Sequence, residues 1–180
     1  KGERSSDNHF SLFSYRDPLA RELVWQIKYH KHPLLVKEVG ILLYEEILEN
    51  ISDSVFFRNQ TQIILAPVPM SPKRKRARGW NQTEEIAKAI LTNDTEKSFS
   101  YSENILEKKD GVLPQTETSS KKERLKNAIG AYAVRDPLSV RDKTIIVIDD
   151  VETTGATFQE IERVFREASA SQVLCFSIAH

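Results

Sequence analysis

Two adjacent acidic residues followed by a threonine-rich loop are the part of this sequence best suited to chemistry. They lie in the stretch KTIIVIDDVETTGATF, residues 143–158, where Asp149 and Asp150 come directly after four apolar residues. A short apolar run without alternation is typical of a strand covered on both faces of a parallel sheet. Ligands of open α/β sheets bind at the carboxyl ends of the strands, which is where the two acids are expected.

The loop after the acids predicts an anion site. Its residues have small side chains, three hydroxyl groups and one glycine; they are Thr153, Thr154, Gly155, Ala156 and Thr157. Such a loop at the start of a helix can surround a phosphate with backbone N–H groups, and the helix dipole favours the negative charge. The loop lacks both the Gly-Lys-Ser/Thr of nucleotide triphosphatases and the spaced glycines of dinucleotide-binding proteins, so the phosphate is of another kind.

The two acids and the loop together suit a sugar phosphate. Carboxylates can accept hydrogen bonds from vicinal sugar hydroxyls, directly or through a metal ion. A ribose 5-phosphate would therefore satisfy both halves of the motif. The simpler alternative is that Asp149 and Asp150 begin a turn while Thr154 caps a helix. That alternative explains the turn but not two acids behind a buried strand.

The helices and strands that must position this motif alternate along the chain. Asp17 and Pro18 predict a helix start, with Leu19, Leu23, Val24 and Ile27 on one face. A second helix after Pro33 has its apolar face at Val39, Leu43, Ile47 and Ile51. Strands are expected at 61–69, 128–134, 144–149 and 172–179, with helices after Asn81 and after residue 157. This order predicts an α/β fold, a mainly parallel sheet flanked by helices with an N-terminal helical hood.

The domain organisation follows from the same pattern. Residues 1–58 are expected to form a polar tail and the helical hood, and residues 59–180 the α/β core. A long basic loop is expected between the strand at 61–69 and the helix after Asn81. The segment at about 93–124 is polar and lacks periodicity, which predicts a flexible loop or a disordered segment.

Composition limits the classes of function. The chain has 180 residues, 39% hydrophobic and 29% charged, and its 26 basic residues equal its 26 acidic residues. Zero net charge gives no global attraction to nucleic acid, and no apolar run approaches the ~20 residues that cross a bilayer. Cys175 is the only cysteine, which excludes an internal disulfide and a cysteine-clustered zinc site. No signal peptide is recognisable, and a cytoplasmic location is expected.

The motif at 145–157, IIVIDDVETTGAT, resembles the signature of the type I phosphoribosyltransferases, which bind phosphoribosyl pyrophosphate (PRPP). Further segments resemble the ComF (competence protein F) and GntX-like branch of that family. They are LVWQIKYHKHP at 23–33, PVPMSPKRKRARGWNQ at 67–82, Gln115 and RLKNAIGAY at 124–132. Trp80 stands where the family usually has phenylalanine. Members commonly open with a four-cysteine zinc module, which this sequence lacks, either because it was lost or because the sequence begins after it.

The resemblance implies a role for each part of the site. Asp149 and Asp150 would hold the ribose and meet Mg2+ indirectly, through the ligand or water, and the loop Thr153–Thr157 would hold the 5-phosphate. The turn after the PVP motif would hold the pyrophosphate through Pro69, Met70, Ser71, Arg74 and Arg78. The segment 107–124 resembles the family's flexible loop, with Lys108, Lys109 and Arg124 as candidate contributors. Asn81 and Gln82 could orient the substrate, although capping is the expected role of Asn81.

Two functions are consistent with the sequence. The first is a Mg2+-dependent phosphoribosyltransferase that uses PRPP and an unidentified acceptor. The second is a non-catalytic accessory protein that handles single-stranded DNA together with competence-machinery proteins, using the basic strip at 73–78 and Trp80. Taken alone, such a strip is more typical of a solvated or nucleic-acid-facing surface. Dimers are common in the family, so a homodimer is one expected assembly.

The sequence predicts no catalytic role for the histidines, Cys175 or Glu152. The four histidines are scattered and far in sequence from the acids, Cys175 is expected to pack in the core, and Glu152 is expected to face solvent.

Overall fold

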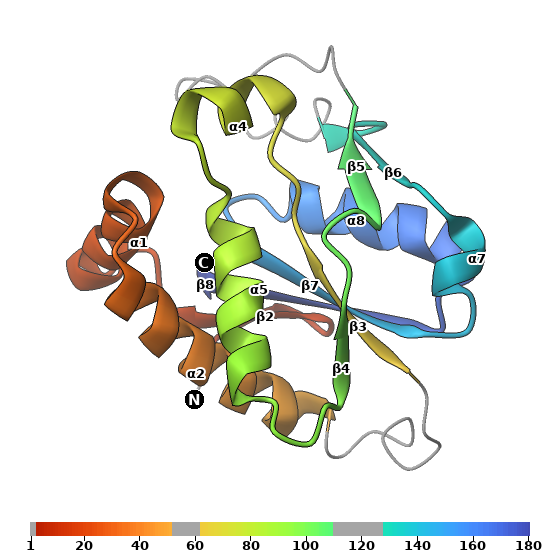
Figure 1. Ribbon diagram of the computed structural model, residues 1–180, viewed down its shortest axis with the longest axis horizontal. Coiled ribbons are helices and arrows are strands. Elements are labelled where there is room, and N and C mark those ends of the chain that lie inside the picture. The colour runs from red at the N-terminus through yellow and green to blue at the C-terminus, as the bar shows by residue number, and fades with distance from the viewer. Residues whose placement is uncertain (1–2, 52–61, 110–127) are drawn as a thin grey trace.

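A mainly parallel six-stranded sheet forms the centre of the molecule (Figure 1). The computed structural model describes residues 3–51, 62–109 and 128–180. The strand order is β1-β2-β8-β7-β3-β4, and β1 alone runs antiparallel to its neighbour in this sheet. The strands are β1 (Glu3–Ser6), β2 (His9–Phe13), β3 (Ile63–Pro67), β4 (Phe99–Tyr101), β7 (Thr144–Val151) and β8 (Gln172–Ala179). The predicted fold class, a mainly parallel sheet flanked by helices, is confirmed.

The apolar run of β7 is buried on both faces, as its lack of alternation predicts. Ile146 and Ile148 belong to the apolar cluster on one face of the sheet, whereas Ile145 and Val147 belong to the cluster on the other. Successive side chains of a strand point to opposite faces, so only a strand covered on both sides needs four apolar residues in succession. β7 pairs with β3 and β8 and is a central strand.

Helices cover both faces of the sheet. The first face carries α1 (Pro18–His30), α2 (Pro33–Ile51) and α5 (Gln82–Asn93), and the second carries α8 (Ala156–Glu167). A short antiparallel pair, β5 (Leu106–Lys108) with β6 (Tyr132–Val134), packs with α8 on the second face. The remaining helices are α4 (Pro72–Arg78) and α7 (Pro137–Val140). No helix within the described ranges is both long and apolar enough to cross a membrane.

The N-terminal residues differ from the expected tail. β2 pairs in parallel with β8, from His9 beside Cys175 to Phe13 beside Ala179, so it belongs to the central sheet. Its sequence, HFSLF, is short and carries little strand signal of its own, and it lies between β1 and β8 in the sheet. On α1, Leu19 is 79% exposed, contrary to the predicted apolar face, whereas Val24 and Ile27 are buried. The buried face of α1 is formed by Ala20, Val24 and Ile27, and Leu19 lies outside it.

Two loop predictions are corrected by the structure. The segment expected to be a loop at about 93–124 contains β4 and β5, and its residues 110–124 lie outside the described residues. The expected basic loop after β3 is instead the helix α4, which Ser71 caps by accepting a hydrogen bond from the backbone N–H of Arg74. Pro72 in the first turn of α4 fits this helix start.

The close packing of α2 on α5 depends on Gly40. A Cβ atom at Gly40 would lie 2.5 Å from the Cβ of Ala89 on α5. We expect Gly40→Val to lower the free energy of unfolding by about 1–3 kcal/mol, because overpacking forces the helices apart. The urea unfolding midpoint measures the effect, and Lys37→Val, on the exposed side of the same helix, controls for the helix propensity of valine. Equal midpoints for the two variants would contradict the prediction.

Candidate functional site

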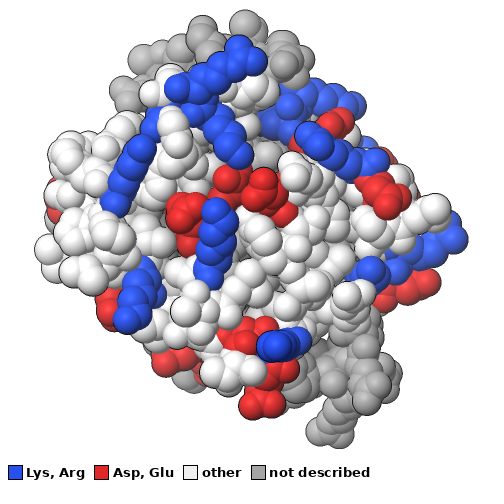
Figure 2. Space-filling view, viewed as in Figure 1, with Lys and Arg blue, Asp and Glu red and all other residues white. Residues whose placement is uncertain are grey.

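A cavity of about 370 Å3 lies at the carboxyl ends of β3 and β7. Residues of β7, of the loops after both strands, and of α1, α4, α5 and α8 line it. Figure 2 shows lysine and arginine side chains standing around a central group of acidic side chains on this face of the molecule. The position is the one expected for a ligand site in an open parallel sheet.

The acidic pair lies in this cavity. The Asp149 carboxylate accepts a hydrogen bond from the backbone N–H of Asp150 at 2.8 Å. Asp150 is buried, and its carboxylate pairs with the Lys28 ammonium at 3.0 Å and accepts a short hydrogen bond from the Gln82 amide. Burial, followed by the neighbouring charge of Asp150, raises the pKa of Asp149 to about 7. The charge of Asp149 therefore responds near neutral pH to the arrival of a ligand or cation.

Lys28 is the site residue that sequence reasoning missed. It comes from the last turns of α1, and its ammonium reaches Asp150 in the cavity. Burial would lower the pKa of Lys28, but the charge and hydrogen bond of Asp150 outweigh burial and raise it, so the ammonium stays charged. The lysine-tyrosine-histidine stretch at 28–30 was noted as part of the family resemblance, and that was the available signal.

The predicted phosphate loop connects β7 to α8 along the cavity wall. All five of its residues line the cavity. Gly155 adopts φ 74°, a left-handed conformation that favours glycine, and it precedes the first residue of α8. No side chain caps this helix start, although the Thr154 hydroxyl accepts a long hydrogen bond from the Ala156 N–H at 3.4 Å. Open backbone N–H groups at a helix start suit an anion.

The residues predicted to bind pyrophosphate lie on the turn after β3 and on α4. Pro69, Met70, Ser71, Arg74 and Arg78 all line the cavity. The Arg78 guanidinium stands 5.0 Å from the ring centre of Tyr29, which also lines the cavity. Stacking of this kind fixes a guanidinium while leaving its N–H groups available to a ligand.

The three flexible-loop candidates have different positions. Lys108 lines the cavity, and its ammonium donates a hydrogen bond to the Tyr132 hydroxyl at 3.2 Å. The pKa of Lys108 is lowered, mainly by burial. The charge of Asp149 acts in the opposite direction, and the charge of Arg74 adds to the lowering. Lys109 is exposed and is not among the residues that line the cavity. Arg124, like Gln115, lies outside the described residues.

Asn81, Gln82 and the basic strip also have defined contacts. Asn81 caps α5 by accepting from the Thr83 N–H, and its amide donates to the carbonyl oxygen of Val68, so the predicted capping role is confirmed. Gln82 is buried, and its amide oxygen has no hydrogen-bond partner among the described residues. Within the basic strip at 73–78, Lys75 pairs with Glu84 at 3.0 Å, whereas Arg74 and Arg78 line the cavity.

Glu152 is buried, not exposed as expected, and it binds a histidine far away in sequence. Its carboxylate pairs with the ring Nδ1 of His9 on β2 at 2.7 Å, and its side chain is 2% exposed. Glu152 also lines the cavity, immediately before the phosphate loop. The two residues are 143 positions apart in sequence, and the pairing of β2 with β8 places them in the same sheet region.

The acidic pair fits Mg2+ as an indirect ligand. Hard oxygen donors suit this ion, which keeps several waters when it binds proteins. Both oxygens of Asp150 are engaged, one by Lys28 and the other by Gln82. An ion would therefore meet the pair through ligand hydroxyls or water, unless one of these two contacts opened.

Comparison with solved structures finds similar chains at low sequence identity. It is similar to a glutamine PRPP amidotransferase from B. subtilis, with 18% identity, a TM-score of 0.43, and coverage of 79% of this chain and 25% of that one. It is also similar to a hypoxanthine phosphoribosyltransferase from Staphylococcus aureus, with 12% identity and a TM-score of 0.42. The match covers 79% of this chain and 61% of that one. The chain thus spans about a quarter of the first structure and less than two thirds of the second.

Sequence comparison identifies a particular relative. The chain is 26% identical over 171 residues to the competence protein ComFC of Streptococcus pneumoniae, across 95% of this chain and 67% of the relative. This similarity confirms the resemblance to the ComF branch that the motifs predict. No family model matches the chain.

Proposed function

We propose that this protein binds PRPP together with Mg2+ in the cavity and transfers the phosphoribosyl group to an acceptor. The observation that carries the proposal is the assembly, in one cavity, of the acidic pair, a helix start without a side-chain cap and two arginines. The first two lie on the segment 149–157, and the arginines come from α4, far away in sequence. These are complements to the three polar parts of PRPP, namely its ribose hydroxyls, its 5-phosphate and its pyrophosphate.

The ribose would be held by the acids. In this proposal Asp149 and Asp150 accept hydrogen bonds from the 2- and 3-hydroxyls, and the loop Thr153–Thr157 binds the 5-phosphate through its backbone N–H groups. The Gln82 amide oxygen, buried and without a hydrogen-bond partner in the part of the chain that the structure describes, supplies one more acceptor beside Asp150. A buried polar atom without a partner is costly unless water or a ligand satisfies it, which supports a polar ligand at this position.

Catalysis would rest on positioning and charge stabilisation. Phosphoribosyl transfer passes through a state with positive charge at the ribose C1, so the leaving pyrophosphate carries negative charge that cations stabilise. Arg74 and Arg78 would bind that group from α4, and Lys108 would approach it from β5. Mg2+, when bound, would supply further neutralisation of the pyrophosphate oxygens.

The proposal also covers where the acceptor enters, where the protein is located and how it assembles. The acceptor would enter beside α1, whose Lys28 and Tyr29 line the cavity. We propose a cytoplasmic protein, in keeping with its single cysteine, and a homodimer as its assembly. ComFC is named as a competence protein, which supports a role with competence-machinery proteins in DNA uptake.

Calorimetric titration with PRPP, with and without Mg2+, tests the proposal. The expected result is saturable binding that requires Mg2+ and that excess pyrophosphate competes away. Absence of binding at millimolar PRPP in the presence of Mg2+ would contradict it.

A second candidate function is the handling of single-stranded DNA, and one observation favours it. Exposed aromatic and basic side chains meet at one edge of the cavity, where Trp25 and Tyr29 are 46% and 56% exposed and Lys31 stands 5.8 Å from the ring centre of Trp80. Stacking surfaces beside cations are typical of sites for single strands. Binding of an oligothymidine that weakens steeply with salt, with no binding of PRPP, would favour this function over the first.

Binding of PRPP should depend on pH through Asp149. Its pKa of about 7 means that the acid is partly protonated at neutral pH, so affinity should rise from pH 6 to pH 8 as the proton leaves. The charge of Lys28 lowers this pKa, and Lys28→Met should therefore move the rise to higher pH. Calorimetry at several pH values measures both profiles, and the ligand's own ionisation cancels in the comparison. Superimposable profiles would contradict the prediction.

A further inference from the structure

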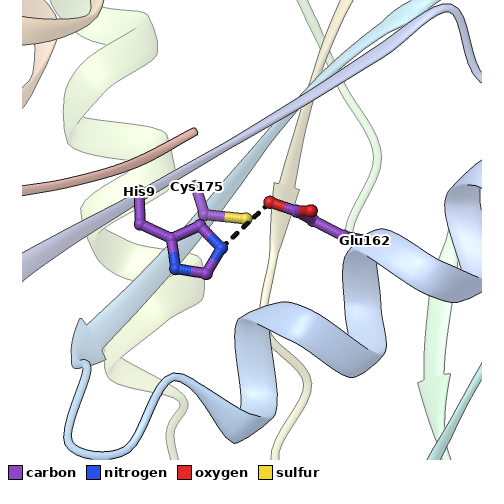
Figure 3. A group of neighbouring side chains, drawn as sticks. All are labelled: His9, Glu162 and Cys175. Atoms are coloured by element: carbon purple, nitrogen blue, oxygen red, sulfur yellow. Dashed lines mark hydrogen bonds and ion pairs between the residues drawn. The ribbon is translucent and has the colours of Figure 1, made fainter. Parts of the chain in front are cut away.

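A buried histidine lies between two glutamates behind the phosphate loop. The Nδ1 atom of His9 is 2.7 Å from Glu152 and its Nε2 atom is 2.9 Å from Glu162 on α8. Figure 3 shows the ring beside Glu162, with the Cys175 thiol next to them. A neutral imidazole has one N–H only, so two carboxylate partners favour the imidazolium. Burial would lower the pKa of His9, but the hydrogen bonds and charges of the glutamates outweigh it and raise the pKa to about 9.

His9, Glu162 and Cys175 also have the donor types of a metal site. Their ligand atoms lie within 4.8 Å of one another. However, Nε2 of His9 already bonds one oxygen of Glu162, and Arg166 binds the other at 3.0 Å. Because the protein satisfies these atoms itself, the group is better explained as an ion-pair network that joins β2 to α8.

The network ends at the phosphate loop. Glu152 directly precedes Thr153, and a Cβ atom built at Gly155 would lie 3.2 Å from the Glu152 carboxylate, which is therefore packed against the loop. A carboxylate at that place opposes any anion that the loop binds. Charges a few ångströms apart interact strongly near a protein surface, so the repulsion between Glu152 and a bound phosphate depends on whether a cation neutralises Glu152. The His9 ring pairs with Glu152 at 2.7 Å, and the His180 ring lies 3.7 Å from its other oxygen.

We propose that His9 is a positioning residue of the phosphate loop, which acts by neutralising and holding Glu152 so that the loop can accept a phosphate monoester. The inference rests on the proposed function, since it assumes that the loop binds the 5-phosphate. The inference goes beyond the proposed function because it makes the loop's affinity for phosphate depend on His9. This counter-ion comes from the opposite end of the chain and is not among the residues that line the cavity.

The test is a charge-rescue experiment with ribose 5-phosphate as the probe, measured by calorimetry at pH 7.5. His9→Gln leaves Glu152 charged and without its imidazolium, and should weaken binding by about tenfold or more. Glu152→Gln removes the opposing charge, while its amide oxygen can still accept from His9, and should bind at least as tightly as the unmodified protein. The double variant His9→Gln with Glu152→Gln should recover binding to within about threefold of the unmodified protein, because no charge remains to be neutralised.

A control and a reference separate the outcomes. Glu162→Gln changes the other partner of His9 by the same chemistry but lies away from the loop, so it should lower thermal stability and leave affinity within about threefold. A double variant as weak as His9→Gln, or a tenfold loss in Glu152→Gln, would overturn the counter-ion role. Failure of the unmodified protein to bind either ribose 5-phosphate or PRPP would overturn the proposed function, and this inference with it. Unmodified binding that His9→Gln does not alter would overturn the inference alone.

Discussion

Neutralising both acids, Asp149→Asn with Asp150→Asn, is expected to weaken PRPP binding by about 100-fold or more. Each carboxylate would lose a charge-assisted hydrogen bond to a ribose hydroxyl, on the scale of roughly 1.5–3 kcal/mol each. Two such losses correspond to at least a factor of about 100 in the dissociation constant. Calorimetric titration with PRPP in the presence of Mg2+ measures the change.

The control for this variant is another adjacent acidic pair. Glu45→Gln with Glu46→Gln neutralises two charges on α2, and neither residue lines the cavity. It should leave the affinity unchanged, whereas a general charge effect would weaken both variants alike. Thermal melting checks the fold, which should survive because removing the buried repulsion between Asp149 and Asp150 offsets the loss of the Lys28 ion pair. An unchanged affinity in the folded double variant would remove the acids from the site.

The central part of the fold could be predicted because its signals are local. The apolar run of β7 and the turn chemistry after it are contiguous in sequence, and the helix after Pro33 buries Val39, Leu43 and Ile47 as its spacing predicts. The same holds for the cavity residues between 149 and 157, which one continuous segment brings together. Local patterns of this kind predict both the type of element and whether it is buried in the sheet.

The parts that could not be predicted depend on contacts between distant segments. β2 is a strand because β8 offers it an edge, and Lys28 reaches the acids because α1 lies beside the ends of the strands. The sequence indicates no role for His9 and predicts an exposed Glu152, yet the two side chains form a buried ion pair. Tertiary contact, which no window of sequence reports, decides such positions.

Replacing Gly155 by alanine is expected to weaken binding of ribose 5-phosphate by about tenfold or more while leaving the protein folded. Gly155 has φ 74°, where an L residue costs roughly 1–2 kcal/mol. Its new Cβ would also meet the Glu152 carboxylate at 3.2 Å and the Gln159 amide at 3.4 Å. The loop must then change its backbone or push Glu152 aside, and either change turns its N–H groups away from the phosphate. Calorimetry with ribose 5-phosphate measures the loss.

Gly130 provides a matched control for the backbone strain of this variant. It has φ 73°, and a Cβ atom there would have no atom within 4 Å. It is not among the residues that line the cavity. Gly130→Ala should therefore lower the melting temperature through the same backbone strain, without the close contacts of Gly155→Ala, and keep the affinity of the unmodified protein. If the two variants lost affinity equally, the effect would come from general destabilisation, and the loop at 153–157 would have no special part in binding the phosphate.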